Sequence, residues 1–153
     1  MTTLYIIRGL PGSGKSTYAR TMAWYLGISY FEADQYFIDY AGNYNFDYKK
    51  LGVAHAQCKK NVFNELEHGR NVIVSNTFTT VSEMDDYVQY ALNNIGANIV
   101  IVQCNASYGS VHNVPEAAMD RMRKRFVETE KLPYWEQSKL FPAFKKMSYI
   151  CLD

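Results

Sequence analysis

The sequence predicts an α/β fold in which a mostly parallel sheet is covered by helices on both faces. Short apolar segments alternate with longer helical segments along the 153 residues, and this alternation is typical of βαβ units. The run Ile99-Val100-Ile101-Val102 is apolar throughout, as expected for a strand buried on both faces. A glycine-rich segment separates the first strand from the first helix. These observations indicate a three-layer α/β/α architecture.

Each element follows from local signals of length, periodicity and termination. Glycines are expected to end helices at Gly27, Gly69 and Gly96. Asp47 is an expected helix N-cap, and Pro115 suits the first position of a helix. The expected elements are strand 4–8, helix 16–26, strand 28–33, loop 40–46, helix 47–68, strand 71–75, helix 82–95, strand 98–104, loop 105–114, helix 115–129 and strand 148–152.

Composition narrows the possible classes of protein. The net charge of +1 excludes a polybasic nucleic-acid binder, although a local basic groove remains compatible with it. The three cysteines form no C-x-x-C pair and are expected to be reduced, buried thiols. We find no signal peptide or membrane span. We therefore expect a single domain, residues 1–153, without a membrane partner, in the cytoplasm, or in the host cytoplasm if the chain is viral.

The glycine-rich segment has the spacing Gly9-x-x-x-x-Gly14-Lys15-Ser16, which is the P-loop pattern. Its backbone N–H groups and the following helix N-terminus can hold phosphate oxygens. Lys15 is expected to contact the β- and γ-phosphates, and Ser16 to bind Mg²⁺. The chain lacks the N-K-x-D motif by which a GTPase would recognise guanine, and it has little room for the second lobe of a mechanical ATPase. These observations favour a kinase. The expected ATP-binding residues are Gly9, Leu10, Pro11, Gly12, Ser13, Gly14, Lys15, Ser16 and Thr17.

Further segments make the chain resemble polynucleotide kinases and related phage and eukaryotic P-loop kinases, including phage 5-hydroxymethyluracil DNA kinases. They are FEADQYF, GNYNFDYKKLGVAHAQC, GRNVIVSNT and HNVPEAAMDRMRKRF, and with the P-loop they cover residues 4–126. The resemblance implies a P-loop kinase fold with a short lid at about 105–126 and ATP with Mg²⁺ as cofactors. It also implies that Asp34 accepts the proton of the acceptor hydroxyl. A carboxylate at a strand's carboxyl end can do this chemistry; an N-cap or a ligand of Mg²⁺-bound water are the alternatives.

The lid helix of the family corresponds to Met119-x-x-Met122-x-x-Arg125-Phe126. Arg121 and Arg125 are four residues apart and share a helical face. They are expected to stabilise charge on the γ-phosphate, as catalytic residues beside Lys15 and Asp34. The alternative is a solvated basic face. His55 and His112 also match the family's patterns and are expected to be structural.

Three departures from the family bear on the acceptor. The segment Ser75-Asn76-Thr77-Phe78 has no acidic residue, and Phe37 and Gly109 stand where polynucleotide kinases have arginines. Expected acceptor-binding residues are Asp34, Tyr36, Phe37 and Thr77.

The missing arginines, with aromatic residues beside Asp34, favour a hydroxymethyl group on a base over a strand terminus. The favoured substrate is therefore nucleic acid, DNA before RNA, with a base such as 5-hydroxymethyluracil. The alternatives are a 5′-hydroxyl, a nucleoside or other small molecule, or a non-catalytic ATP switch. The sequence leaves open the oligomeric state and the role of residues 133–153.

Overall fold

The structure, a computed structural model, describes residues 1–109, 112–133 and 147–152. Its centre is a five-stranded sheet of order β2-β3-β1-β4-β5, in which every neighbouring pair is parallel. The strands are β1 (Thr3–Arg8), β2 (Ser29–Phe31), β3 (Val72–Ser75), β4 (Asn98–Cys104) and β5 (Met147–Leu152). The α-helices are α1 (Lys15–Leu26), α2 (Leu51–Glu67), α3 (Val81–Tyr90) and α4 (Glu116–Arg125).

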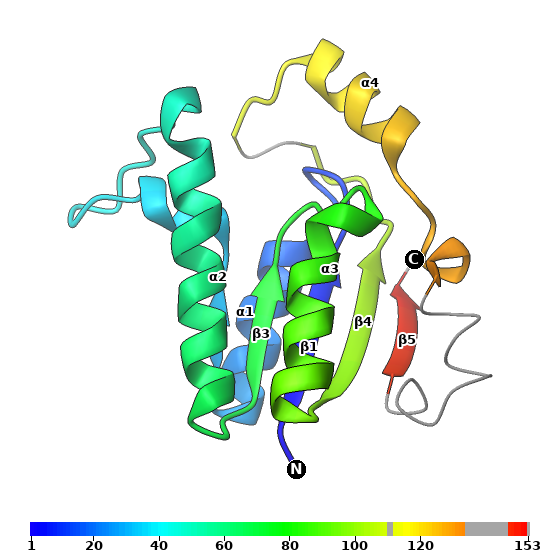
Figure 1. The fold of residues 1–153 in the computed structure, drawn as a ribbon. Coiled ribbons are helices and arrows are strands. Elements are labelled where there is room, and N and C mark those ends of the chain that lie inside the picture. The colour runs from blue at the N-terminus through cyan, green and yellow to red at the C-terminus, as the bar shows by residue number, and fades with distance from the viewer. Residues whose placement is uncertain (110–111, 134–146, 153) are drawn as a thin grey trace.

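Helices cover both faces of the sheet (Figure 1). On one face, α2 and α3 pack against apolar side chains of the central strands, including Leu4, Ile6 and Val74, in the larger buried cluster. On the other face, α1 contributes Ala19 and Ala23 to a second cluster. This arrangement confirms the expected α/β/α layers and the parallel sheet, since strands covered on both faces are apolar throughout.

The strand order places a crevice at the carboxyl ends of the central strands. β1 lies between β3 and β4, so the chain leaves the end of β1 toward one side of the sheet and later returns to the other. Open α/β sheets bind ligands at such a switch point, at the carboxyl ends of the strands. The segment that follows β1 here is the P-loop.

Local geometry departs from the expected elements beside this crevice. β2 ends at Phe31, and the next residues form a 3₁₀ helix, η1 (Ala33–Phe37), so Asp34 lies on a turn and not at a strand end. The Gln35 side chain accepts a hydrogen bond from the Glu32 N–H at 3.2 Å, and this contact starts the turn. Asp47 caps a short 3₁₀ helix, η2 (Tyr48–Lys50), by accepting the Lys49 N–H at 2.9 Å before α2 begins.

The helix expected over 115–129 is shorter than predicted. α4 ends at Arg125, and Phe126 is extended. Two contacts draw the chain away from the helical path: the Phe126 ring lies 4.3 Å from the Arg8 guanidinium, and the Val127 N–H donates to the Thr79 carbonyl at 2.8 Å. A 3₁₀ turn, η4 (Thr129–Lys131), follows.

The helix expected over 82–95 is α3 followed by a π-helical turn, η3 (Ala91–Ile95), and it ends at Gly96 as predicted. The last strand is also confirmed, at Met147–Leu152. Cys58 and Cys104 are buried, but Cys151 is exposed because β5 is an edge strand. The aromatic segment after Leu132 lies largely outside the described residues. No helix in the described ranges has the length and apolar character needed to cross a membrane.

Candidate active site at the P-loop

Backbone hydrogen bonds shape the phosphate-binding loop. The Gly9 N–H donates to the Thr77 carbonyl at 3.2 Å, and the Ser13 N–H donates to the Leu10 carbonyl at 3.1 Å. Gly12 has a φ of 81°, and a Cβ there would lie 2.5 Å from the Gly109 carbonyl oxygen. Only glycine meets both conditions, because a side chain is disfavoured at this φ and would also collide with backbone.

The lid loop rests on the P-loop through Tyr108. Its N–H donates to the Gly12 carbonyl at 2.8 Å. Its ring would lie 3.0 Å from a Cβ at Gly14. The ring itself is exposed. Glycines that admit a close backbone approach are the only sequence signal of this contact.

Lys15 opens α1 and lies partly buried behind the loop. Burial lowers its pKa, and the carboxylates of Glu32 and Asp34 offset part of that effect. Both carboxylates are therefore near enough for their charges to act on the ammonium group. An anionic ligand would add a favourable charge to a desolvated cation.

Asp34 is the centre of a cluster that joins η1 to the lid. Its side chain is 48% exposed. The Tyr44 hydroxyl donates to Asp34 Oδ1 at 3.3 Å, and His112 Nε2 lies 3.9 Å from Oδ2. The Tyr44 and His112 rings are stacked, with their centroids 4.0 Å apart. Burial and the Asp34 charge raise the pKa of Tyr44 to about 12, so its phenol remains a donor at neutral pH.

These contacts revise the expectations for the aromatic residues. Phe37 is only 4% exposed and belongs to the larger core cluster, so the prediction that it stacks on a base disagrees with the structure. Its place at the end of η1 turns its ring inward, against Tyr44 and Phe46. Tyr36 is 43% exposed. Thr77 is held near the P-loop through its carbonyl's contact with Gly9.

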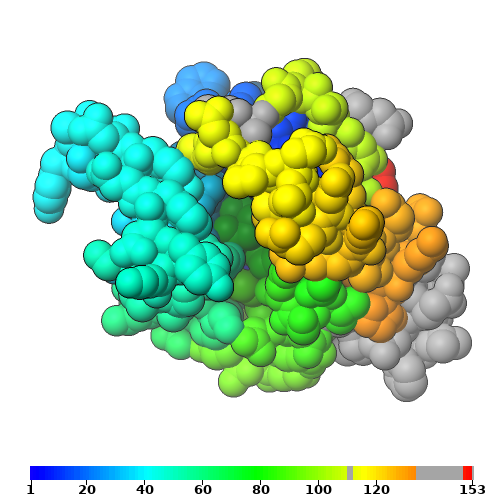
Figure 2. All heavy atoms as spheres, turned by 90° about the horizontal axis from the view of Figure 1, so that it is seen from above, coloured from blue at the N-terminus to red at the C-terminus, as the bar shows by residue number. Residues whose placement is uncertain are grey.

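The lid arginines have different surroundings. The Arg125 Nε donates to Thr79 Oγ1 at 2.9 Å, which brings this side chain to the residues that follow β3. Arg123 bonds to Glu116 and Asp120 on its own helix. Arg121 is exposed and makes no hydrogen bond or ion pair with the described residues. Viewed from above the strand ends, the molecule is hollowed between the segment carrying η1 and helix α4 (Figure 2).

Arg8 is a buried cation that sequence analysis missed. Its Nε and Nη2 donate to the Phe78 carbonyl at 3.1 and 2.8 Å, and Nη1 donates to Thr129 Oγ1 at 3.0 Å. Burial lowers its pKa to about 10, so it remains charged at neutral pH. Arg8 therefore ties the strand before the P-loop to both the β3–α3 loop and the lid's return. A charged residue ending an apolar strand was the available signal.

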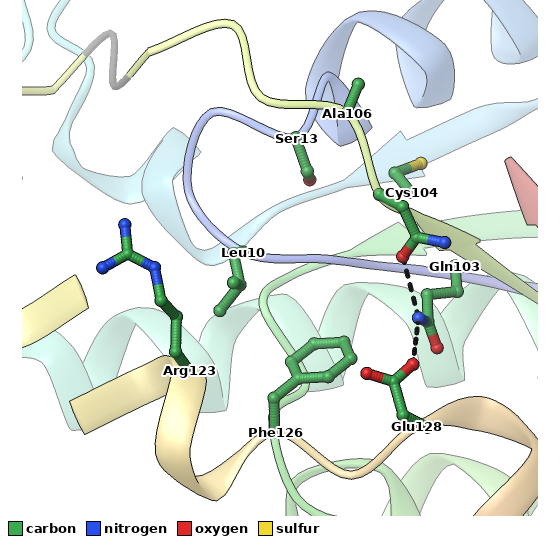
Figure 3. Close-up of a pocket in the computed structure, with 9 residues that line it drawn as sticks. Leu10, Ser13, Gln103, Cys104, Ala106, Arg123, Phe126 and Glu128 are labelled. Carbon is green, nitrogen blue, oxygen red and sulfur yellow. Dashed lines mark hydrogen bonds between the residues drawn. The ribbon is translucent and has the colours of Figure 1, made fainter. Parts of the chain in front are cut away.

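A cavity of about 260 Å³ lies between the P-loop and the segment after α4. In Figure 3, Leu10 and Ser13 face this cavity from the P-loop, opposite Phe126 and Glu128. Its lining residues are Leu10, Ser13, Gln103, Cys104, Asn105, Ala106, Arg123, Phe126 and Glu128. The P-loop and the segment after α4 thus line the same cavity, so a movement of this segment would change the shape of the cavity.

The hydroxyl and carboxylate oxygens of Ser16, Ser75 and Glu32 are of the type that binds magnesium. Ser16 lies exposed in the first turn of α1, while Ser75 Oγ and Glu32 Oε1 are buried without a hydrogen-bond partner among the described residues. Hydroxyl and carboxylate oxygens are the ligands that Mg²⁺ prefers, and it retains several waters. The described residues contain no group of three or more His, Cys, Asp or Glu able to hold a metal by themselves. Ser16, with phosphate oxygens and water, would hold the ion.

The sheet order, the P-loop and the lid above it define a P-loop kinase-like fold. Similar folds are found in a chain of the Pnkp1/Rnl/Hen1 RNA repair complex (TM-score 0.64, 18% identity, 90% of this chain and 46% of that chain). A gluconokinase from Sinorhizobium meliloti 1021 has a TM-score of 0.58 and 12% identity, and the match covers 97% of this chain and 82% of that chain. Chaetomium thermophilum Kti12 in complex with ADP-AlF3 has a TM-score of 0.59 and 12% identity, and the match covers 98% of this chain and 89% of that chain. At these identities the likeness is one of fold.

The family is shown by sequence. A family model described as an AAA domain matches residues 4–129, and the chain belongs to that family. Human NEDD4-binding protein 2 is 38% identical over 88 residues, which are 56% of this chain. The match spans only 5% of that human protein, and this chain spans under half of the RNA repair complex chain.

Proposed function

We propose that this protein is a kinase that transfers the γ-phosphate of ATP, bound with Mg²⁺, to a hydroxyl group on nucleic acid. One observation carries the proposal: Asp34, half exposed, lies close enough to the P-loop for its charge to act on Lys15. A carboxylate that faces a phosphate site and remains open to solvent can receive an acceptor hydroxyl. Residues 1–153 would act as one domain, with the lid at about 105–126.

Each residue of the crevice has a role in this reaction. The P-loop backbone and Lys15 bind the phosphates, and Ser16 contributes to the Mg²⁺ site. Asp34 orients the acceptor hydroxyl and takes its proton as the new O–P bond forms and ADP leaves. Arg125, with Arg121, supplies positive charge from the lid as charge develops on the transferred phosphoryl group.

A hydroxymethyl group on a base is the acceptor we favour. Tyr36 is exposed and supplies aromatic surface two residues after Asp34, in place of the buried Phe37. Base–aromatic stacking contributes about 1–3 kcal/mol per base. Phe37 and Gly109 supply no positive charge for a terminal phosphate. DNA containing 5-hydroxymethyluracil is a substrate of this class.

A 5′-hydroxyl of DNA or RNA is the second candidate. The structural similarity to a chain of an RNA repair complex containing Pnkp1 favours it, and so does Arg121, which is exposed and unpaired within the described part of the lid. Similarity to a gluconokinase favours a small-molecule acceptor more weakly, because that identity is lower still.

Matched oligonucleotides decide between the acceptors. One DNA strand carries a 5′-phosphate and an internal 5-hydroxymethyluracil, and its twin carries a 5′-hydroxyl and thymine at the same position. RNA twins, a free nucleoside and gluconate complete the panel. Transfer of radiolabelled γ-phosphate to the first strand alone supports the base acceptor, and transfer to the second supports 5′-end phosphorylation. ATP binding without transfer to any acceptor would favour the switch instead.

A further inference from the structure

Two strand ends beside the P-loop carry oxygens without partners. Glu32 Oε1 and Ser75 Oγ are both buried, and neither has a hydrogen-bond partner among the described residues. Ser75 is only 1% exposed. An unsatisfied buried polar group costs roughly 1–3 kcal/mol, and more when it is charged. Such groups are rare enough in folded proteins to require a reason.

The sheet register places these two side chains together. Phe31 of β2 pairs with Val74 of β3 in a parallel ladder, and Glu32 continues in an extended conformation with φ −132° and ψ 144°. Glu32 therefore follows in register with Ser75. Tyr30 and Ile73, two residues earlier, pack in the cluster with α1. Since strand side chains alternate between faces, Glu32 and Ser75 leave the sheet on the α1 side.

The N-terminus of α1 brings Lys15 and Ser16 to the same side. Among the carboxylates that raise the pKa of Lys15, Glu32 has the largest effect, ahead of Asp34. Asn76 stands in the segment after β3 where related kinases have an acidic residue. Its Oδ1 accepts a hydrogen bond from the Ala33 N–H at 2.9 Å. The β3 end thus fixes the backbone that carries Glu32 and does not itself supply a charge.

We infer that Glu32, with the Ser75 hydroxyl beside it, forms the acidic wall of the Mg²⁺·ATP site. Its carboxylate accepts hydrogen bonds from water bound to the cation, which gives the two unpartnered oxygens their partners. The carboxylate that the end of β3 lacks comes from the neighbouring strand at the same level of the sheet. This inference rests on the proposed function only in that ATP binds with Mg²⁺, and it is independent of the acceptor.

The test is a Mg²⁺ titration of ATP binding, without any acceptor. The Glu32→Gln variant keeps the shape of the side chain and removes its charge. ATP affinity is measured by calorimetry in EDTA and across Mg²⁺ concentrations. Loss of a group that orients a metal's ligands typically weakens metal affinity by about 10–100-fold. We expect the Mg²⁺ midpoint of Glu32→Gln to rise by about that factor.

Glu67→Gln is the matched control. It removes one negative charge from the end of α2, which lies at the opposite end of the sheet (Figure 1). Its Mg²⁺ midpoint should equal that of the wild type. Ser75→Ala removes a hydroxyl that has no hydrogen-bond partner among the described residues, so the change breaks no hydrogen bond there. We expect its midpoint to rise by about fivefold, the effect of one hydrogen bond.

A different role for Glu32 gives a different result. If Glu32 only neutralises Lys15, Glu32→Gln will bind ATP more tightly in EDTA and keep the wild-type Mg²⁺ midpoint, which would overturn the inference. If Glu32→Gln does not fold, an unchanged midpoint in Ser75→Ala overturns it equally. A wild-type protein that binds no ATP at any Mg²⁺ concentration would contradict the proposed function itself.

Discussion

The two sides of the crevice are built from different parts of the chain. On the nucleotide side, the groups that can bind phosphate are mostly backbone N–H groups, positioned by main-chain bonds from Gly9 to Thr77 and from Tyr108 to Gly12. Their placement depends on glycine conformations and on the sheet edge. This side can therefore keep its shape when most of its side chains change.

On the acceptor side, the groups facing the crevice are side chains that hold one another. Asp34 accepts from Tyr44, Tyr44 stacks on His112, and His112 comes from the lid loop. Removing one member alters the position of the next. For the function we propose, this difference predicts that triphosphate binding depends on the fold, whereas acceptor choice depends on a few exchangeable residues.

The largest effect expected is that of Lys15→Ala, which tests the nucleotide side. The ammonium group is the one side-chain cation of the P-loop, and its removal should lower phosphoryl transfer by about three orders of magnitude. The melting temperature without nucleotide should hardly change, because burial of Lys15 is unfavourable for its charge. Single-turnover kinetics and calorimetric melting check the two parts. A collapse of stability without nucleotide would show that Lys15 supports the fold instead.

Variants of Phe37 and Tyr36 distinguish, on the acceptor side, a buried residue that stabilises the fold from an exposed residue that could contact the acceptor. Phe37→Ala should lower the free energy of unfolding by about 3–5 kcal/mol, because it empties a buried position. Tyr36→Ala should leave stability within about 0.5 kcal/mol and lower kcat/KM for the acceptor about tenfold through lost stacking. Denaturant unfolding and acceptor kinetics are measured on both variants. A stable Phe37→Ala with impaired acceptor use would restore the sequence-based assignment.

Much of the fold was predictable because its signals are local. The glycines that end α1 and η3 each adopt a left-handed conformation at the expected residue, since few other residues do so at low cost. The apolar runs of β1 and β4 left no alternative to buried strands. The P-loop was predictable for the same reason, because its spacing encodes its geometry.

The acceptor side was less predictable because it depends on contacts between distant residues. The prediction for Phe37 was wrong because a short 3₁₀ helix turns its ring inward, and nothing in FEADQYF shows which ring of the pair Tyr36 and Phe37 is buried. The helix end at Arg125 depends on Arg8, more than a hundred residues away in sequence. The spacing of residues along the sequence does not show which distant side chains will be in contact.

Asp34→Asn is second only to Lys15→Ala in its expected effect on transfer, and it tests whether the acceptor side does chemistry. The amide keeps the shape of the carboxyl but cannot take a proton. A positioned general base contributes about 10²–10⁴-fold, and loose phosphoryl transition states favour the low end. We expect transfer to fall about 10²-fold while ATP affinity is retained. Weaker Mg²⁺·ATP binding, with partial rescue by raised Mg²⁺, would make Asp34 a metal ligand instead.

The smallest effect expected is that of Tyr44→Phe, which removes only the hydroxyl that bonds to Asp34 at 3.3 Å. The ring still stacks on His112, so the change isolates one hydrogen bond of about 1 kcal/mol, or about fivefold in acceptor kcat/KM. Because the pKa of Tyr44 is raised to about 12, the phenol donates throughout the range from about pH 6 to 9, and the deficit should be constant across it. Tyr90→Phe is the control, since it removes a similar phenol–carboxylate bond, to Glu67. Equal kinetics in the two variants would mean that Asp34 needs no help from Tyr44, and that the acceptor side depends less on mutual side-chain contacts than its geometry indicates.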